Sequence, residues 1–206
     1  MSKTTNQIKN LTMMALFVAI EIILLVTPFG YLRIGFLNAT LMHVPVIVCA
    51  CVMSTKFGAF LGLVFGITSV INATMAPTIT SFAFSPFVEI GGFQGGFQSL
   101  IIAIVPRVLL GIIGGCLYRF LLKKSFTKTK SAAISAGIAT CLHTLMVLGL
   151  IVVFYAAPYA KAVGVASSAL MAYMGTVLLT NMIPEIIVAI LVNMALVKAL
   201  ASRFNK

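Results

Sequence analysis

The chain has 206 residues, 61% of them hydrophobic and 8% charged, and its 14 Lys and Arg residues far outnumber its three carboxylates. This composition excludes an ordinary soluble globular domain. The basic residues flank apolar stretches instead of forming a patch on a water-exposed fold, which excludes a nucleic-acid-binding role. The four cysteines lie in apolar stretches without the spacing of a metal site, so we expect no bound metal.

Apolar stretches long enough to cross a bilayer recur along the chain, since a transmembrane helix needs ~20 predominantly apolar residues. The sequence therefore predicts an all-α integral membrane protein, with residues 1–206 as a single membrane domain folded into a compact bundle of six transmembrane helices. The expected spans are residues 11–28, 37–54, 57–74, 99–121, 132–155 and 178–199.

Positive charge is divided unevenly between the two sides of this bundle. Arg33 and Lys161 fall on one side and Arg107 lies inside a span, whereas the other Lys and Arg residues flank the side that carries both termini. Short loops rich in Lys and Arg stay in the cytoplasm during insertion. The sequence therefore predicts that both termini face the cytoplasm.

The first span contains Ala15 and Ala19 in an AxxxA arrangement. Small residues four apart lie on one helix face and let another helix approach closely, so we interpret this face as a docking surface for another membrane protein. The chain has no GxxxxGK[ST] motif for binding a nucleotide. The energy for moving a substrate inward would then come from a partner.

The third span contains Gly58, Gly62 and Gly66, which are spaced four residues apart. This spacing places all three glycines on one face of a helix. Such a face predicts that the backbone of a neighbouring helix packs closely against the third span.

The segment between the third and fourth spans, residues 75–97, differs from its surroundings. Its sequence, MAPTITSFAFSPFVEIGGFQGGF, contains two prolines, four glycines and five phenylalanines. It is too broken for a span and too aromatic for an ordinary linker, and long loops in compact domains are commonly lids or binding loops. We interpret it as a cap over a cavity that opens outward. The alternative is an interfacial re-entrant piece without a ligand role.

Polar residues inside the spans fall at similar depths when the helix rise of ~1.5 Å per residue is counted from the outer ends. An ionised side chain at membrane depth costs ~2.5–3.5 kcal/mol on insertion scales, so it should face a partner or a wet cavity. The sequence predicts one shared polar chamber. Its expected ionisable residues are Glu21, His43, Arg107 and Glu185, with Asn38, Asn72 and Asn181 at the level above.

Each of these residues has an alternative interpretation. Arg107 is the only basic residue expected deep inside a span, and its planar guanidinium suits a ligand carboxylate. Alternatively, Arg107 and Glu185 form a structural ion pair. His43 is either a ligand contact or a core histidine, and Glu21 either contacts the ligand or bridges two helices. We expect His143, in the middle of the fifth span, to be a structural hydrogen-bonding residue.

Three stretches resemble the substrate-capture (S) components of energy-coupling factor (ECF) vitamin transporters, and the likeness covers about residues 10–200. They are FGYLRIGFLNATLMHVPVI (29–47), GAFLGLVFGITSVINATMAPTITSFAFSPF (58–87) and SLIIAIVPRVLLG (99–111), and they are most similar to the pantothenate-type branch. The resemblance implies six helices in a bacterial cell membrane, a vitamin site near the outer face and outer loops that close over it.

The same resemblance implies partners. Ala15 and Ala19 would pack on a transmembrane coupling subunit, two cytoplasmic ATPases would use ATP, and the whole S component would topple in the bilayer to deliver its vitamin. This chain itself would need no cofactor and would not be an enzyme.

Pantothenate suits the expected chamber because it carries one carboxylate, one amide, two hydroxyls and a gem-dimethyl group. Arg107 would bind the carboxylate, while Glu185 belongs to the same expected site. The absence of Trp disfavours a large flat ring such as that of riboflavin or folate. The neutral hydrogen-bonding residues are expected to be Asn38, His43, Asn72 and Asn181, and the apolar wall Phe82, Phe84 and Phe87.

Three other functions compete with capture of pantothenate. An S component for another vitamin, such as folate or riboflavin, fits the same resemblance. A stand-alone small-molecule transporter is disfavoured because no internal repeat is recognisable. An intramembrane enzyme is disfavoured because the spans contain no GxSxG, HExxH or paired aspartates.

Overall fold

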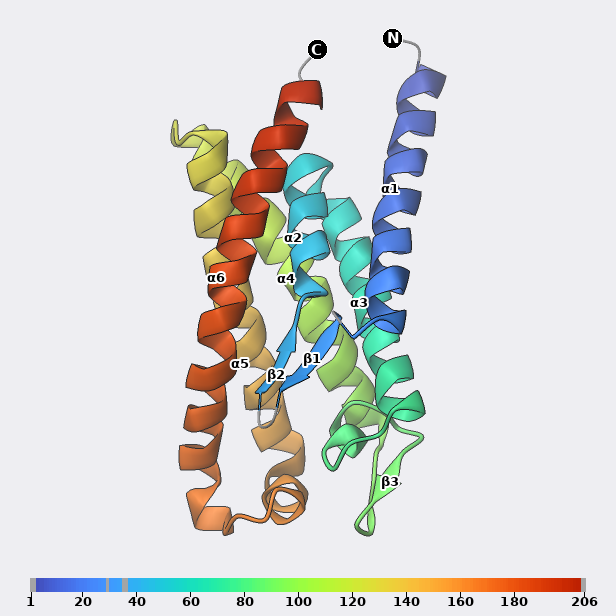
Figure 1. The fold of residues 1–206 in the computed structure, drawn as a ribbon, viewed down its shortest axis with the longest axis vertical. Helices are drawn as coiled ribbons and strands as arrows, with labels where there is room; N and C mark the ends of the chain where they lie inside the picture. The colour runs from blue at the N-terminus through green and yellow to red at the C-terminus, as the bar shows by residue number, and fades with distance from the viewer. Residues whose placement is uncertain (1–2, 29, 35–36, 205–206) are drawn as a thin grey trace.

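The computed structural model describes residues 3–28, 30–34 and 37–204, and side-chain environments for 4–28, 30 and 40–200. The described chain forms a helical bundle with two short β-hairpins (Figure 1). Five of its helices, α1, α3, α4, α5 and α6, are long and apolar enough to cross a membrane. The helices are α1 (Lys3–Val26), α2 (His43–Val52), α3 (Thr55–Met75), α4 (Phe97–Lys123), α5 (Lys128–Ala162) and α6 (Leu170–Phe204).

The second expected span, residues 37–54, is corrected. Its first residues form strand β2 (Leu37–Thr40), which pairs antiparallel with β1 (Tyr31–Ile34). The helix begins only at His43 and has ten residues, about 15 Å of rise. Nine of those ten residues are buried, so α2 is a short helix inside the bundle that does not span it. The periodicity of a short apolar run does not distinguish a strand from part of a helix, so the sequence pattern did not separate the two.

Four of the other expected spans lie within longer helices, and the first, residues 11–28, extends two residues beyond the end of α1. In particular α5 extends to Ala162 and α6 begins at Leu170, so most of residues 156–177, between the fifth and sixth expected spans, is helical. Figure 1 shows both chain termini at one end of the bundle, together with the α2–α3 and α4–α5 connections. The opposite end carries residues 76–96 and the short 3₁₀ turn Ser167–Ala169.

Helices α3 and α4 pack closely along the three glycines of α3, as their spacing predicts. A Cβ added to Gly62 would overlap the backbone carbonyl oxygen of Arg107. One added to Gly66 would lie 2.9 Å from the Cα of Ile104, closer than real Cβ atoms approach. The backbone of α4 at Arg107 is therefore held directly against α3.

Each of the helices α4, α5 and α6 contains an interior proline: Pro106, Pro158 and Pro184. Proline has no N–H, so each one leaves the carbonyl four residues earlier without its helical donor. In α5 the break is visible as non-helical dihedral angles at Tyr155 (φ −135°, ψ 25°).

The segment after α3 is a packed unit containing the 3₁₀ turn Ser81–Ala83 and the hairpin of β3 (Glu89–Ile90) and β4 (Phe93–Gln94). Phe82 is fully buried and packs edge-on against Tyr155 of α5, with ring centroids 5.5 Å apart. The Ser99 hydroxyl donates to the Phe82 carbonyl oxygen at 2.6 Å. These contacts hold the segment on α4 and α5, and we call residues 76–96 the cap.

Candidate ligand-binding site

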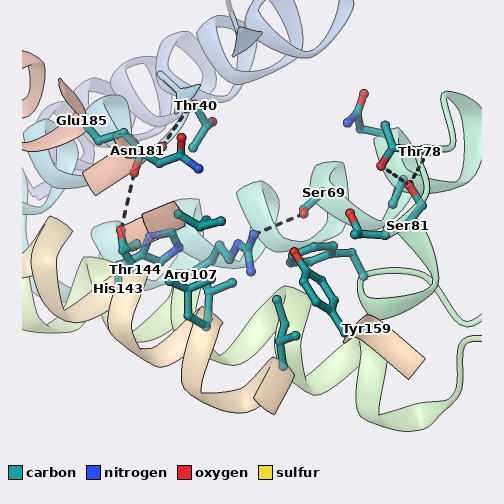
Figure 2. A pocket seen from close by; sticks show the side chains of 18 residues that line it. Thr40, Ser69, Thr78, Ser81, Arg107, His143, Thr144, Tyr159, Asn181 and Glu185 are labelled. Atoms are coloured by element: carbon teal, nitrogen blue, oxygen red, sulfur yellow. Dashed lines mark hydrogen bonds between the residues drawn. The ribbon is translucent and has the colours of Figure 1, made fainter. Parts of the chain in front are cut away.

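A cavity of about 200 Å³ lies between α3, α4, α5 and α6, next to the cap and the end of β2 (Figure 2). Twelve of its eighteen lining residues have polar side chains, which is unusual for the interior of a membrane bundle. The lining residues are Thr40, Ser69, Asn72, Ala73, Thr78, Thr80, Ser81, Phe84, Arg107, His143, Thr144, Val147, Leu148, Ile151, Tyr159, Val177, Asn181 and Glu185.

Arg107 supplies the positive charge of the cavity and is only 6% exposed. Its guanidinium carbon lies 5.4 Å from the ring centroid of Phe65 and 5.4 Å from that of Phe84, so two aromatic rings flank the cation. One terminal nitrogen donates to the Ile102 carbonyl oxygen at 2.6 Å, and the other approaches the Ser69 hydroxyl at 3.5 Å. Figure 2 shows the guanidinium in the middle of the lining residues.

Glu185 supplies the negative charge, from α6. One carboxylate oxygen accepts a hydrogen bond from the backbone N–H of Thr40 at 2.9 Å, and the other from the Thr144 hydroxyl at 3.4 Å. The carboxylate therefore connects three segments, β2, α5 and α6, at one side of the cavity. Its hydrogen bonds also make it a fixed acceptor with a defined orientation.

Two polar atoms of the wall lack hydrogen-bond partners within the described part of the chain. They are Nε2 of His143 and Oδ1 of Asn181, and both are buried. A buried polar atom without a partner costs ~1–3 kcal/mol. The wall is therefore suited to a ligand or water that supplies the missing hydrogen bonds.

The cap contributes hydroxyl groups to the opposite side of the cavity. The Ser81 hydroxyl accepts from the backbone N–H of Thr78 at 2.8 Å, and Thr80 and Tyr159 line the same region. In Figure 2, Thr78, Ser81 and Tyr159 lie on the other side of Arg107 from Thr144 and Glu185. A small molecule with a negative group and several neutral polar groups could contact all of them at once.

The family described as "ECF transporter, substrate-specific component" matches residues 9–197 of this sequence. The chain belongs to this family. It is similar to the pantothenic acid transporter PanT of Lactococcus lactis subsp. cremoris, with 32% identity over 97% of both chains. It is also similar to the pantothenate transporter PanT of Leuconostoc mesenteroides, with 25% identity over 94% of this chain and 92% of the relative. This S component is accordingly a multi-pass bacterial membrane protein.

Five of the residues predicted for the S component's site line the cavity: Asn72, Phe84, Arg107, Asn181 and Glu185. Whether they touch a ligand stays a prediction.

Three other predicted residues lie outside the cavity wall. His43 is buried at the start of α2 but outside the lining, and Phe82 belongs to the hydrophobic cluster between the cap and the neighbouring helices. Phe87 is 77% exposed and lines nothing. The backbone of Asn38 lies in β2, and its side chain lies outside the described part of the structure.

The structure also places two other polar residues, Glu21 and His143, differently from the expected chamber. Glu21 was expected at the depth of the chamber, but its side chain is fully buried and is not part of the cavity wall. His143, expected to be structural, lines the cavity and packs near Phe65 at 6.1 Å between ring centroids. Depth along a helix is therefore an incomplete guide, because it does not specify which way a side chain faces.

The residues that sequence reasoning missed are mostly hydroxyls. Serine and threonine inside helices commonly bond to a preceding carbonyl, as Thr180 does to the carbonyl of Thr176 at 2.9 Å. No pattern in the sequence distinguishes such a residue from one that faces a cavity. The missed residues include Thr40, Ser69, Thr78, Thr80, Ser81, Thr144 and Tyr159.

The face of α1 that carries Ala15 and Ala19 is uncovered in the described structure. Both alanines are exposed, and α1 is the least buried of the five long apolar helices. The neighbouring Leu16 is 61% exposed. This apolar face is open to lipid or to another membrane protein.

Proposed function

We propose that this S component captures pantothenate in the cavity around Arg107 and delivers it to the cell as part of an ECF importer. The observation that carries the proposal is the placement of one buried cation, flanked by two aromatic rings, in an otherwise neutral or acidic polar wall. Both relatives carry the name of a pantothenate or pantothenic acid transporter, which supports the same substrate.

The carboxylate, the hydroxyl groups and the gem-dimethyl group of pantothenate would each have a counterpart in the wall. The carboxylate would bind the guanidinium of Arg107, because a planar fork can donate two parallel hydrogen bonds to two oxygens. The hydroxyl groups would donate to Glu185 and to the unpartnered oxygen of Asn181. The gem-dimethyl group would pack on the apolar part of the wall, which contains Val147 and Ile151. A cavity of about 200 Å³ favours such a small ligand over a large ring system.

The partners of the proposed importer are a transmembrane coupling subunit and two cytoplasmic ATPases. The uncovered α1 face with Ala15 and Ala19 would dock on the coupling subunit. Both termini would face the cytoplasm, because most basic residues flank their side of the bundle. ATP hydrolysis by the partners would drive toppling of this chain, which itself would hold no cofactor and catalyse no reaction.

Titration calorimetry of the purified chain against separate water-soluble vitamins tests the proposal. We expect one pantothenate per monomer to bind without ATP, while riboflavin and folate do not bind. Binding of another vitamin in place of pantothenate would overturn the substrate assignment. Pantothenate uptake into liposomes by this chain alone would overturn the dependence on partners.

A further inference from the structure

We propose that Pro106 is a positioning residue for Arg107: the carbonyl that this proline leaves free in α4 anchors the guanidinium that binds the ligand carboxylate. The inference rests on the proposed function, because it concerns how that site recognises an acid. It assigns a role to a residue that does not line the cavity itself.

The backbone of α4 explains why an acceptor is available. In an α-helix the N–H of residue i donates to the carbonyl of residue i−4, so residue 106 would normally serve Ile102. Proline has no N–H, so the Ile102 carbonyl loses that donor. The guanidinium of Arg107 donates to this same oxygen at 2.6 Å. The side chain of one residue thus replaces the missing backbone donor of its neighbour.

The Arg107 donor is important because the Ile102 carbonyl is buried. The Ile102 residue has no exposed surface, so its carbonyl has no route to solvent water. A hydrogen bond from a charged donor is shorter and stronger than one between neutral groups. The bond therefore satisfies a buried acceptor and restrains the guanidinium at the same time.

The direction of the bond determines where the charge is held. Ile102 precedes Arg107 in α4, so the side chain runs back toward Phe97, where the helix meets the cap. Gly62 keeps the Arg107 backbone close to α3, which brings the guanidinium within reach of the Ser69 hydroxyl at 3.5 Å. Because the backbone and one terminal nitrogen of Arg107 are both held, its guanidinium has a fixed orientation toward the cavity.

The other interior prolines show that the effect is specific to Pro106. Pro158 and Pro184 also directly precede cavity residues, Tyr159 and Glu185. The carbonyls that they free belong to residues 154 and 180. Among the described residues, no side chain donates a hydrogen bond to either carbonyl. Pro184 therefore offers a matched control, a helix proline beside a charged cavity residue without an anchoring bond.

The test compares Pro106→Ala with Pro184→Ala in the full chain, using two ligands. One ligand is pantothenate, and the other is the primary alcohol in which a hydroxymethyl group replaces the carboxylate. In Pro106→Ala the restored N–H competes for the Ile102 carbonyl, and the guanidinium loses its anchor. We expect pantothenate to bind about 10-fold more weakly, as for loss of one charge-assisted hydrogen bond, with the affinity for the alcohol nearly unchanged.

Pro106→Ser restores the same N–H with a different side chain and should give the same loss of discrimination between acid and alcohol. Pro184→Ala should change the affinities for both ligands by the same factor. If Pro106→Ala changes neither affinity, or both equally, the positioning role is wrong. If the unmodified chain does not bind pantothenate at all, the proposed function fails, and this inference fails with it.

Discussion

The backbone N–H of Thr40 donates to Oε1 of Glu185 at 2.9 Å, although the two residues are 145 positions apart in the chain. Thr40 ends the β1–β2 hairpin, and Glu185 lies in the middle of α6. The bond therefore couples the position of the hairpin to the wall of the cavity. A carboxylate that binds a ligand hydroxyl would at the same time hold the hairpin beside the ligand.

Glu185→Ala should weaken pantothenate binding by about 10- to 100-fold, because a hydrogen bond to a charged group contributes ~1.5–3 kcal/mol. Glu185→Gln keeps an oxygen acceptor for Thr40 and should show a clearly smaller loss. Titration calorimetry of both variants provides the measurement. Equal affinities for the Ala variant and the unmodified chain would show that the carboxylate contributes nothing to binding.

Gly62→Ala should destabilise the bundle and weaken binding together, because its Cβ would overlap the Arg107 carbonyl and force α3 and α4 apart. Overpacking of this kind costs ~1–3 kcal/mol. Gly149→Ala is the control, since a Cβ there has nothing within 4 Å and lies on an exposed helix surface. Thermal unfolding in detergent should give a lower midpoint for Gly62→Ala only, and identical midpoints for both variants would contradict the close packing.

Alanine substitutions of Phe82 and Phe87 should differ sharply in their effect on stability, although both residues come from the same aromatic segment. Phe82→Ala removes a fully buried ring that packs on Tyr155 and should destabilise the protein by ~3–5 kcal/mol. Phe87→Ala removes a ring that is 77% exposed and should leave the unfolding midpoint nearly unchanged. Similar unfolding midpoints for the two variants would mean that the cap is not packed as described.

Ala15→Trp and Ala19→Trp should block pantothenate uptake by the complete importer while leaving ligand binding intact. A bulky ring on this face would prevent close approach of a helix from the coupling subunit. Phe60→Trp, on an exposed position of α3, is the control and should transport normally. Undiminished uptake by both alanine variants in cells would rule out this face as the docking surface.

The charged part of the site could be predicted because ionised side chains inside apolar stretches are rare and need a partner or a cavity. Arg107 and Glu185 stand out for that reason, and both line the cavity. Glu21 has the same signal, yet its buried side chain packs away from the wall. Hydropathy and depth place a residue along a helix, whereas the direction it faces depends on how the helices pack.

The fold could be predicted for the long helices but not for residues 37–54. Long apolar stretches identified the regions of α1, α3, α4, α5 and α6, because a helix is the structure that satisfies its own backbone in lipid. Residues 37–54 misled, since a short strand followed by a short buried helix is as apolar as one continuous span. The packing of Phe82 and the exposure of Phe87 also depend on the local turn, which single-sequence patterns do not specify.

The measurement that tests the central claim most directly is pantothenate binding by Arg107→Ala, with Arg119→Lys as the control. Arg119 lies on the same helix and bonds to Thr55 at 2.6 Å, but it is not part of the cavity wall. We expect Arg107→Ala to insert into the membrane and show no detectable pantothenate binding, while Arg119→Lys binds like the unmodified chain. Pantothenate affinity unchanged by Arg107→Ala would contradict the account.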